Sequence, residues 1–338
     1  ITNAGCSGGI VFSWQAEWDK KTWNTMHAVD LDNTAYWSDW QTNEQSMGIM
    51  TFDPGKTESI CYVDGDVSEW TEDDVVAEAG QMSLSMKYDE KFLYFLIWKD
   101  DFHAAEDTLY IPLDITPKTG STYCQNEGVS FERGADFLIV IRGKEDSHVL
   151  VQERYDVLQA MYSHEMNSTD PYLNPADKDS PVFNQIHLIL QTDPVFKTGN
   201  FNAPAETYET GKLHYGNGNP KSEAFDSLAD FIFSDEYVEI RLPWQLLNFS
   251  NPSEMLVHDD YYECYGVENM KIDRMYAGIG VKDEDAGRIS MEALALEGWG
   301  KEVTFHERLK KSYYALQELW TNSEAWEEQK GGEIDAGK

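Results

Sequence analysis

Five aspartates lie at turns or at the ends of apolar runs, where their carboxylates could hold a cation. A hard ion such as Ca²⁺ takes several oxygen ligands, and loops can wrap around it. The chain has no EF-hand spacing, so the fold would have to bring these ligands together. The alternative is that Asp64 and Asp66 only form an Asx-type turn around Gly65. The candidate ligands of one structural Ca²⁺ are Asp64, Asp66, Asp100, Asp101 and Asp114.

Three tryptophans, Trp70, Trp98 and Trp299, are candidates for contact with a sugar. An indole offers a flat apolar face to the C–H face of a sugar ring, and nearby polar side chains can bond the hydroxyls. Trp244 follows an apolar run and is expected in the core instead. Ordinary packing in half-buried sheets is the alternative for all of them, and it should account for most of the 11 Trp and 18 Tyr.

The sequence does not identify a catalytic residue. A chain with 61 Asp and Glu contains many carboxylate pairs, so pairs alone do not indicate glycosidase chemistry. Neither a zinc-binding HExxH pattern nor a GxSxG nucleophile turn is present. We therefore expect this chain to be non-catalytic by itself.

The charge of the chain restricts its partners. A formal net charge of −35 repels nucleic acid and anionic membrane surfaces, and no run of about twenty apolar residues could span a bilayer. The four cysteines, at positions 6, 61, 124 and 264, form no CxxC pair. We expect isolated thiols, with one disulfide as the alternative.

The apolar pattern predicts a mainly β protein. Ser83–Tyr88 alternates with period two, and Phe92–Trp98 is an almost continuous apolar run across a short turn. Because a run of this length and composition is typical of a buried central strand, we expect these two segments to form a hairpin. Further strands are expected near residues 107–115, 135–143, 148–155, 184–190, 230–233, 237–242, 276–281 and 290–296.

The order of these features resembles a known family. The Asp64–Asp66 turn with Trp70 is followed by a hairpin that ends in Trp98-Lys99-Asp100-Asp101, and later by Val238–Leu247. This order is similar to family 9 carbohydrate-binding modules and to DOMON-like β-sandwiches of bacterial glycoside hydrolases, over residues 60–297. The resemblance implies an antiparallel β-sandwich of jelly-roll or DOMON-like type. It also implies a polysaccharide or oligosaccharide ligand and an extracellular or cell-surface location.

The N-terminal stretch differs in kind from the rest. Gly8–Trp14 resembles the last strand of a (β/α)8-barrel glycoside hydrolase, where the strand ends build the active site. The resemblance implies that Trp14 lines a sugar site with Glu17 just beyond, and that a catalytic domain precedes this chain. The alternative is a structural arm that packs on the sandwich. Residues 35–55 are expected to be a linker held against a neighbour.

The C-terminal stretch predicts a helix. Thr304 and Glu307 have the spacing of a capping box, and a row of apolar residues follows at helical intervals. We expect this helix to dock on the body of the protein, where it could contact residues 1–56. The row consists of Phe305, Leu309, Tyr313, Leu316 and Trp320.

Three regions and two functional hypotheses follow. The regions are an N-terminal arm and linker over 1–56, a sandwich over 57–300, and a helix with a tail over 301–338. The first hypothesis is a carbohydrate-binding or accessory module of a secreted glycoside hydrolase. The alternative is a structural domain that supports and completes a glycosidase barrel without binding sugar independently.

Overall fold

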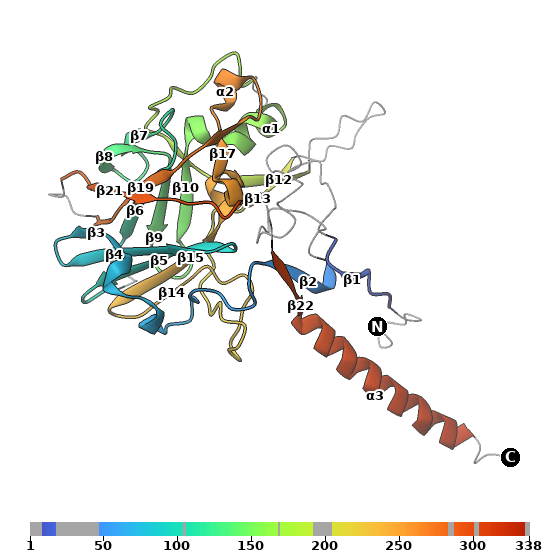
Figure 1. Cartoon of the computed structure of the whole chain (residues 1–338). Helices are drawn as coiled ribbons and strands as arrows, with labels where there is room; N and C mark the ends of the chain where they lie inside the picture. Colours follow the sequence, from blue (N-terminus) through green and yellow to red (C-terminus); the bar gives the residue numbers. More distant parts are fainter. Residues whose placement is uncertain are drawn as a thin grey trace.

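A computed structural model shows a mainly β protein with several antiparallel sheets and few helices (Figure 1). Two large sheets account for most of the strands, and smaller sheets and short helices surround them. The structure describes residues 9–17, 47–103, 106–167, 170–191, 205–282, 287–300 and 304–334. Residues 35–46 of the expected linker lie outside this set.

The first large sheet has five antiparallel strands. The expected hairpin is present as β4 and β5, and Asp89 closes its turn by accepting hydrogen bonds from the backbone N–H of Lys91 and of Phe92. β5 is central, with β15 on its other side. The sheet order is β14 (Phe231–Phe233), β15 (Tyr237–Pro243), β5 (Phe92–Lys99), β4 (Met82–Tyr88) and β3 (Val75–Ala79).

The second large sheet has seven strands. Its central strands, β9 and β6, are apolar on both sides, which is typical of strands covered on two faces. β20 (Gly280–Val281) pairs with β6 beside the main path. The order along that path is β11 (Phe183–Gln185), β10 (His148–Gln152), β9 (Phe137–Ile141), β6 (Leu109–Asp114), β19 (Arg274–Gly278) and β21 (Met291–Ala295).

The inward side chains of both large sheets form one hydrophobic cluster. Phe95 and Ile240 contribute from the first sheet, and Ile111 and Ile139 contribute from the second. Trp244 is fully buried in this cluster, as expected, and its indole N–H donates to the carbonyl of Asp89 over 3.0 Å. Because apolar burial stabilises by roughly 25 cal/mol per Å², this cluster holds the two sheets together.

The outward face of the seven-stranded sheet has a second, smaller cluster. Tyr110, Leu138 and Val140 point outward from the sheet and pack against Cys124 and Phe131 of a separate hairpin. That hairpin consists of β7 (Ser121–Cys124) and β8 (Val129–Ala135). Leu150 of β10 and Phe183 of the edge strand β11 complete this cluster.

Short elements occupy the connections. The expected strand at 184–190 is divided into β11 and β12 (His187–Gln191), and β12 pairs with β13 (Glu206–Glu209). The helices are α1 (Val157–Asn167), α2 (Tyr261–Cys264) and the 3-10 turns η3 (Val67–Glu69), η4 (Glu72–Asp74), η5 (Glu153–Tyr155), η6 (Trp244–Leu247) and η7 (Pro252–Glu254). A three-stranded sheet contains β16 (Phe249–Asn251), β17 (Leu256–His258) and β18 (Asn269–Lys271).

The arm and the tail form a separate small sheet. β1 (Ser13–Gln15) runs parallel to β2 (Gly48–Pro54), and β2 pairs antiparallel with β22 (Phe305–Leu309). The backbones of β1 and β2 approach so closely that a Cβ at Gly48 would lie 2.1 Å from the nitrogen of Ala16. Strands from near the two ends of the chain therefore form one sheet.

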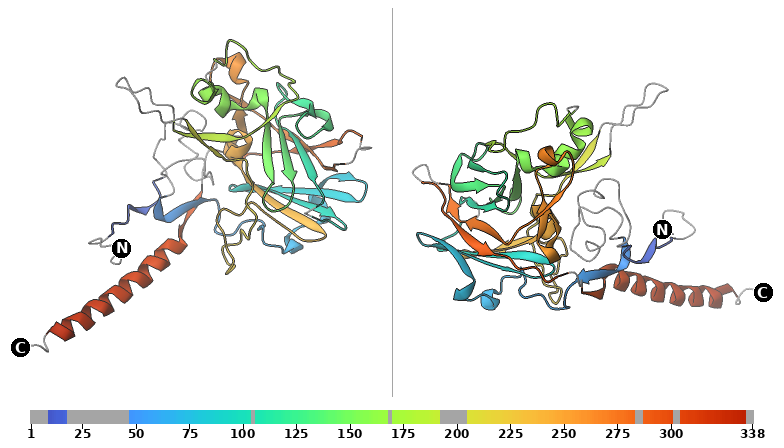
Figure 2. Two further views of the ribbon diagram at one scale, coloured as in Figure 1. Left: turned by 180° about the vertical axis from the view of Figure 1, so that it is seen from behind. Right: turned by 45° about the horizontal axis from the view of Figure 1, so that its top comes forward.

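The expected start of the C-terminal helix is wrong. Residues 305–309 form strand β22, because their backbone groups pair with β2, and the helix α3 covers Lys311–Ile334. Figure 1 and Figure 2 show α3 extending away from the large sheets, so it does not dock on them, whereas the expected contact with residues 1–56 is present at the start of the helix. Trp320 is 54% exposed, and Tyr313 packs edge-on against Trp14 of β1.

Cys61, Cys124 and Cys264 are free thiols. Burial raises the pKa of the Cys124 thiol to about 11, so it stays protonated at neutral pH. Cys6 lies outside the described residues.

Candidate functional site

The Asp64–Trp70 stretch packs on the outward face of the five-stranded sheet and encloses Glu239 of β15. The carboxylate of Glu239 accepts hydrogen bonds from the backbone N–H of Gly65 over 2.8 Å and from the indole of Trp70 over 3.3 Å. Gly65 has φ +91°, a conformation that favours glycine. Burial raises the pKa of Glu239 to about 7, although these hydrogen bonds oppose the shift. The motif thus surrounds a buried carboxyl group.

The two aspartates of this motif take part in its turns. Asp64 accepts from the backbone N–H of Asp66 over 2.9 Å and from the side chain of Asn219 over 2.6 Å. Asp66 caps the turn η3 by accepting from the N–H of Ser68. This is the geometry of the Asx-type alternative.

The other two candidate tryptophans are half-buried. Trp98 packs edge-on against Tyr237, with ring centroids 5.5 Å apart, on the same face as Trp70. Trp299 packs against the buried Trp244 at 6.0 Å, and its buried indole N–H has no hydrogen-bond partner among the residues that the structure describes. The role of these three tryptophans in sugar contact stays a prediction.

The remaining candidate metal ligands lie apart from that turn. Asp100 and Asp101 are exposed after β5, whereas Asp114 is buried at the end of β6 and pairs with Arg133 over 2.8 Å. Within the described ranges, no three His, Cys, Asp or Glu residues are grouped in a way that could hold a metal ion. The Ca²⁺ site stays a prediction.

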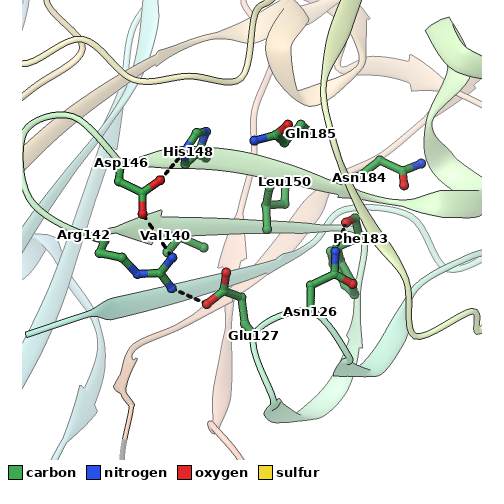
Figure 3. A pocket seen from close by; sticks show the side chains of 10 residues that line it. All are labelled: Asn126, Glu127, Val140, Arg142, Asp146, His148, Leu150, Phe183, Asn184 and Gln185. Carbon is green, nitrogen blue, oxygen red and sulfur yellow. Dashed lines mark hydrogen bonds and ion pairs between the residues drawn. The ribbon is translucent and has the colours of Figure 1, made fainter.

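The outward face of the seven-stranded sheet carries an open groove of about 330 Å³ near β10 and β11 (Figure 3). Its floor is apolar, with Val140 and Leu150 pointing outward from β9 and β10. Polar side chains from three separate parts of the chain surround this floor in Figure 3. They are Asn126, Glu127, Arg142, Asp146, His148, Asn184 and Gln185.

One side of the groove is a network of paired charges. Arg142 binds Glu127 and, over 3.4 Å, Asp146. His148 lies between Asp146 at 3.0 Å and Glu209 at 2.5 Å. The hydrogen bond from His148 lowers the pKa of Asp146, with Arg142 contributing, so Asp146 is ionised at neutral pH. These contacts fix the side chains before any ligand arrives.

The other side of the groove is made of neutral amides. Asn126 donates to the carbonyl of Phe183 over 2.9 Å, which positions its side chain at the rim. Asn184 donates to Asp156 and Gln159, so its amide is also fixed. Gln185 is exposed, and its side-chain amide makes no hydrogen bond to any described residue. Gln185 therefore offers both a donor and an acceptor to a ligand.

A second cavity of about 410 Å³ adjoins the groove and shares Asn184 and Gln185 with it. Asp156, Gln159, His187 and Thr207 line its other side. Burial raises the pKa of Asp156 to about 6, against hydrogen bonds from Gln159 and Asn184. The two cavities together make an extended polar surface across β11.

Sequence reasoning did not find this groove. Its polar residues come from a hairpin turn, a strand end and an edge strand, and no local spacing connects them. The available signal was the polar Asn184-Gln185 pair next to apolar strand residues, together with His148 at a strand start.

Comparisons with family models, curated proteins and solved structures find no match to this chain. Among the described helices, none is both long enough and apolar enough to cross a membrane.

Proposed function

We propose that this chain binds a neutral polysaccharide or oligosaccharide in the groove of the seven-stranded sheet. In this proposal it serves as the accessory module of a secreted glycoside hydrolase, outside the cell or at its surface. The observation that carries the proposal is the ring of fixed amides and paired charges around an apolar floor, with the free amide of Gln185 at its edge.

The chemistry of the groove suits a sugar. Each sugar hydroxyl is both a donor and an acceptor, and side-chain amides and paired ions offer both. The apolar base of the groove is largely buried, with Val140 1% and Leu150 7% exposed, so the contacts with a sugar would be mainly polar. The net charge of −35 opposes an anionic ligand, which supports a neutral sugar over nucleic acid.

The proposal treats the two large sheets as the halves of an antiparallel β-sandwich of jelly-roll or DOMON-like type. Two features support this: the sheets share one hydrophobic cluster, and all pairings within them are antiparallel. Such a scaffold holds a site on strands, where side-chain positions are better fixed than on loops.

Affinity electrophoresis in gels that contain barley β-glucan, xylan, galactomannan or starch tests the proposal. We expect the wild-type protein to be retarded in at least one gel, and Gln185→Ala to weaken that binding about tenfold, or ~1.4 kcal/mol. The matched control is Gln81→Ala, an exposed glutamine in the turn between β3 and β4. No retardation in any gel, or equal retardation of Gln185→Ala, contradicts the proposal.

A second candidate is the supporting role for an upstream catalytic domain of the same chain. The small sheet of the arm favours it, because β1 and β2 are parallel, as strands of a barrel are. Ile10 and Phe12, which precede β1, are 98% and 65% exposed, and Trp14 of β1 is 56% exposed. An exposed apolar patch of this kind marks a surface that another protein part could cover.

The two roles differ in what the arm does. If the supporting role holds, Phe12→Ser should lower hydrolase activity of the full-length parent chain and leave polysaccharide retardation unchanged. If the arm has no such role, activity of the parent chain should be unaffected by Phe12→Ser.

A further inference from the structure

Three tyrosines stack where α2 meets the segment 170–182. The ring of Tyr172 lies 5.8 Å from that of Tyr261, at an interplanar angle of 12°, and 5.6 Å from that of Tyr265, at 28°. Tyr265 is 80% exposed and Tyr172 is 40% exposed. The stack therefore presents aromatic surface to solvent.

A buried ion pair fixes the two parts of this stack to each other. Arg154 of η5 binds Asp260 through Nη2 over 2.9 Å and Nε over 3.1 Å. Its Nη1 donates to the carbonyl of Ala176 over 2.7 Å. Asp260 in turn caps α2 by accepting from the N–H of Tyr262. One guanidinium thus connects the segment that carries Tyr172 with the helix that carries Tyr261.

The backbone of Tyr265 is strained. Its φ is +54°, in the left-handed region that bulky residues rarely adopt, and it ends α2 directly before Gly266. Glycine or asparagine would adopt this conformation more easily. Its ring stacks on Tyr172 within the chain but stays 80% exposed, so the strained backbone holds an aromatic side chain at the surface, where a ligand can reach it.

Polar groups border the stack. Lys178 and Glu263 form an ion pair over 2.5 Å, and both side chains remain about half exposed. Flat aromatic faces beside hydrogen-bonding side chains suit a sugar ring, whose C–H face is apolar and whose hydroxyls project from its edge. The acidic chain disfavours an anionic ligand here also.

We infer that Tyr172, Tyr261 and Tyr265 form an aromatic platform that stacks on sugar rings of a neutral polysaccharide. This inference rests on the proposed function and adds a second contact surface, separate from the groove. Segment 170–182 leads directly into β11, whose Asn184 and Gln185 line the groove. The platform and the groove are therefore connected by one continuous piece of chain.

The test is affinity electrophoresis of Tyr265→Ala and Tyr172→Ala in the same four polysaccharide gels. We expect each variant to weaken retardation at least about fivefold. Tyr314→Ala is the matched control, because Tyr314 is an exposed tyrosine on α3, far along the chain from both surfaces. Far-ultraviolet circular dichroism and the melting temperature confirm that each variant is folded.

The outcomes separate the platform from the groove. Weaker binding by the platform variants with normal binding by Gln185→Ala supports the platform and contradicts the groove. The reverse pattern overturns the platform and supports the groove. No wild-type retardation in any gel overturns both. Self-association of the wild-type protein in sedimentation, abolished by Tyr265→Ala without a change in sugar binding, also overturns the platform, because the tyrosines would then bind a second protein chain.

Discussion

The outward faces of the two large sheets differ in how they are covered. On the five-stranded sheet, the Asp64–Trp70 stretch encloses the buried carboxyl group of Glu239, and Trp98 packs against Tyr237. On the seven-stranded sheet, a hairpin covers the central strands but leaves a polar groove at β10 and β11. The Asp64–Trp70 motif, which is the more conspicuous in the sequence, thus stabilises the five-stranded sheet. The accessible polar side chains line the groove on the seven-stranded sheet.

The largest effect is expected from Glu239→Ala on the covered face. The substitution leaves the N–H groups of Gly65 and Trp70 without their acceptor in a buried place, which should lower the free energy of unfolding by about 3 kcal/mol. Glu239→Gln keeps an acceptor of the same shape and should cost about 1 kcal/mol. Urea unfolding measures both. If Glu239→Ala is as stable as the wild-type protein, the motif does not stabilise this face.

A second prediction concerns pH. Burial raises the pKa of Asp136, Asp230 and Glu239 to about 7 and that of Asp156 to about 6. Between pH 4 and pH 7 the folded protein holds protons that the unfolded chain has released, so stability falls as pH rises through this range. We expect the free energy of unfolding to be higher at pH 5.5 than at pH 7.5, by about 2 kcal/mol for each group with a pKa near 7.

Substitutions on each face should show which groups cause the pH dependence of the free energy of unfolding. Glu239→Gln should flatten part of the pH profile, because it removes a group with a raised pKa. Asp146→Asn on the open face should not flatten it, because the pKa of Asp146 is lowered and this group stays ionised over the whole range. A free energy of unfolding that rises from pH 5.5 to pH 7.5 would contradict the raised pKa values of these buried carboxyl groups.

Third, the cations of the two faces should have different roles. Arg142→Met removes the partner of Glu127 and Asp146 and should weaken polysaccharide binding at least tenfold, with a loss of stability of about 1 kcal/mol. Lys87→Met removes the partner of Asp74 and should lower stability by a similar amount without a change in binding. Affinity electrophoresis and thermal melting measure both. Equal effects on binding would show that the faces are not distinct.

The smallest effect is expected from calcium. If the Asx-type alternative holds, Asp64 and Asp66 only accept hydrogen bonds within their turns, and adding 1 mM CaCl₂ or EDTA should shift the melting temperature by less than about 2 °C. A rise of several degrees with CaCl₂ that disappears in Asp66→Asn would establish the predicted Ca²⁺ site instead.

The local sequence pattern was sufficient to predict some strands and one core residue. The β4–β5 hairpin and the buried Trp244 follow from period-two alternation, a turn signal and an apolar run, which act over a few residues. The tail strand β22 could not be predicted in this way. Phe305–Leu309 fits a helical row, but pairing with β2, about 250 residues away in sequence, determines its conformation.

The candidate site was harder to predict for the same reason. Glu127, Arg142 and Asn184 meet only because the hairpin folds over the sheet and β11 pairs with β10. Trp70 and Trp98 were conspicuous by residue type, but the buried Glu239 that Trp70 contacts lies far from it in the sequence. Residue type identified the aromatics, whereas long-range packing determines which polar groups remain accessible.

The most direct test compares the two faces in one experiment. Gln185→Ala, Trp98→Phe and the wild-type protein are run side by side in the polysaccharide gels. We predict that Gln185→Ala loses most of its retardation and that Trp98→Phe is retarded like the wild-type protein. Loss of retardation by Trp98→Phe with normal retardation of Gln185→Ala would contradict this prediction and would place the sugar on the five-stranded sheet.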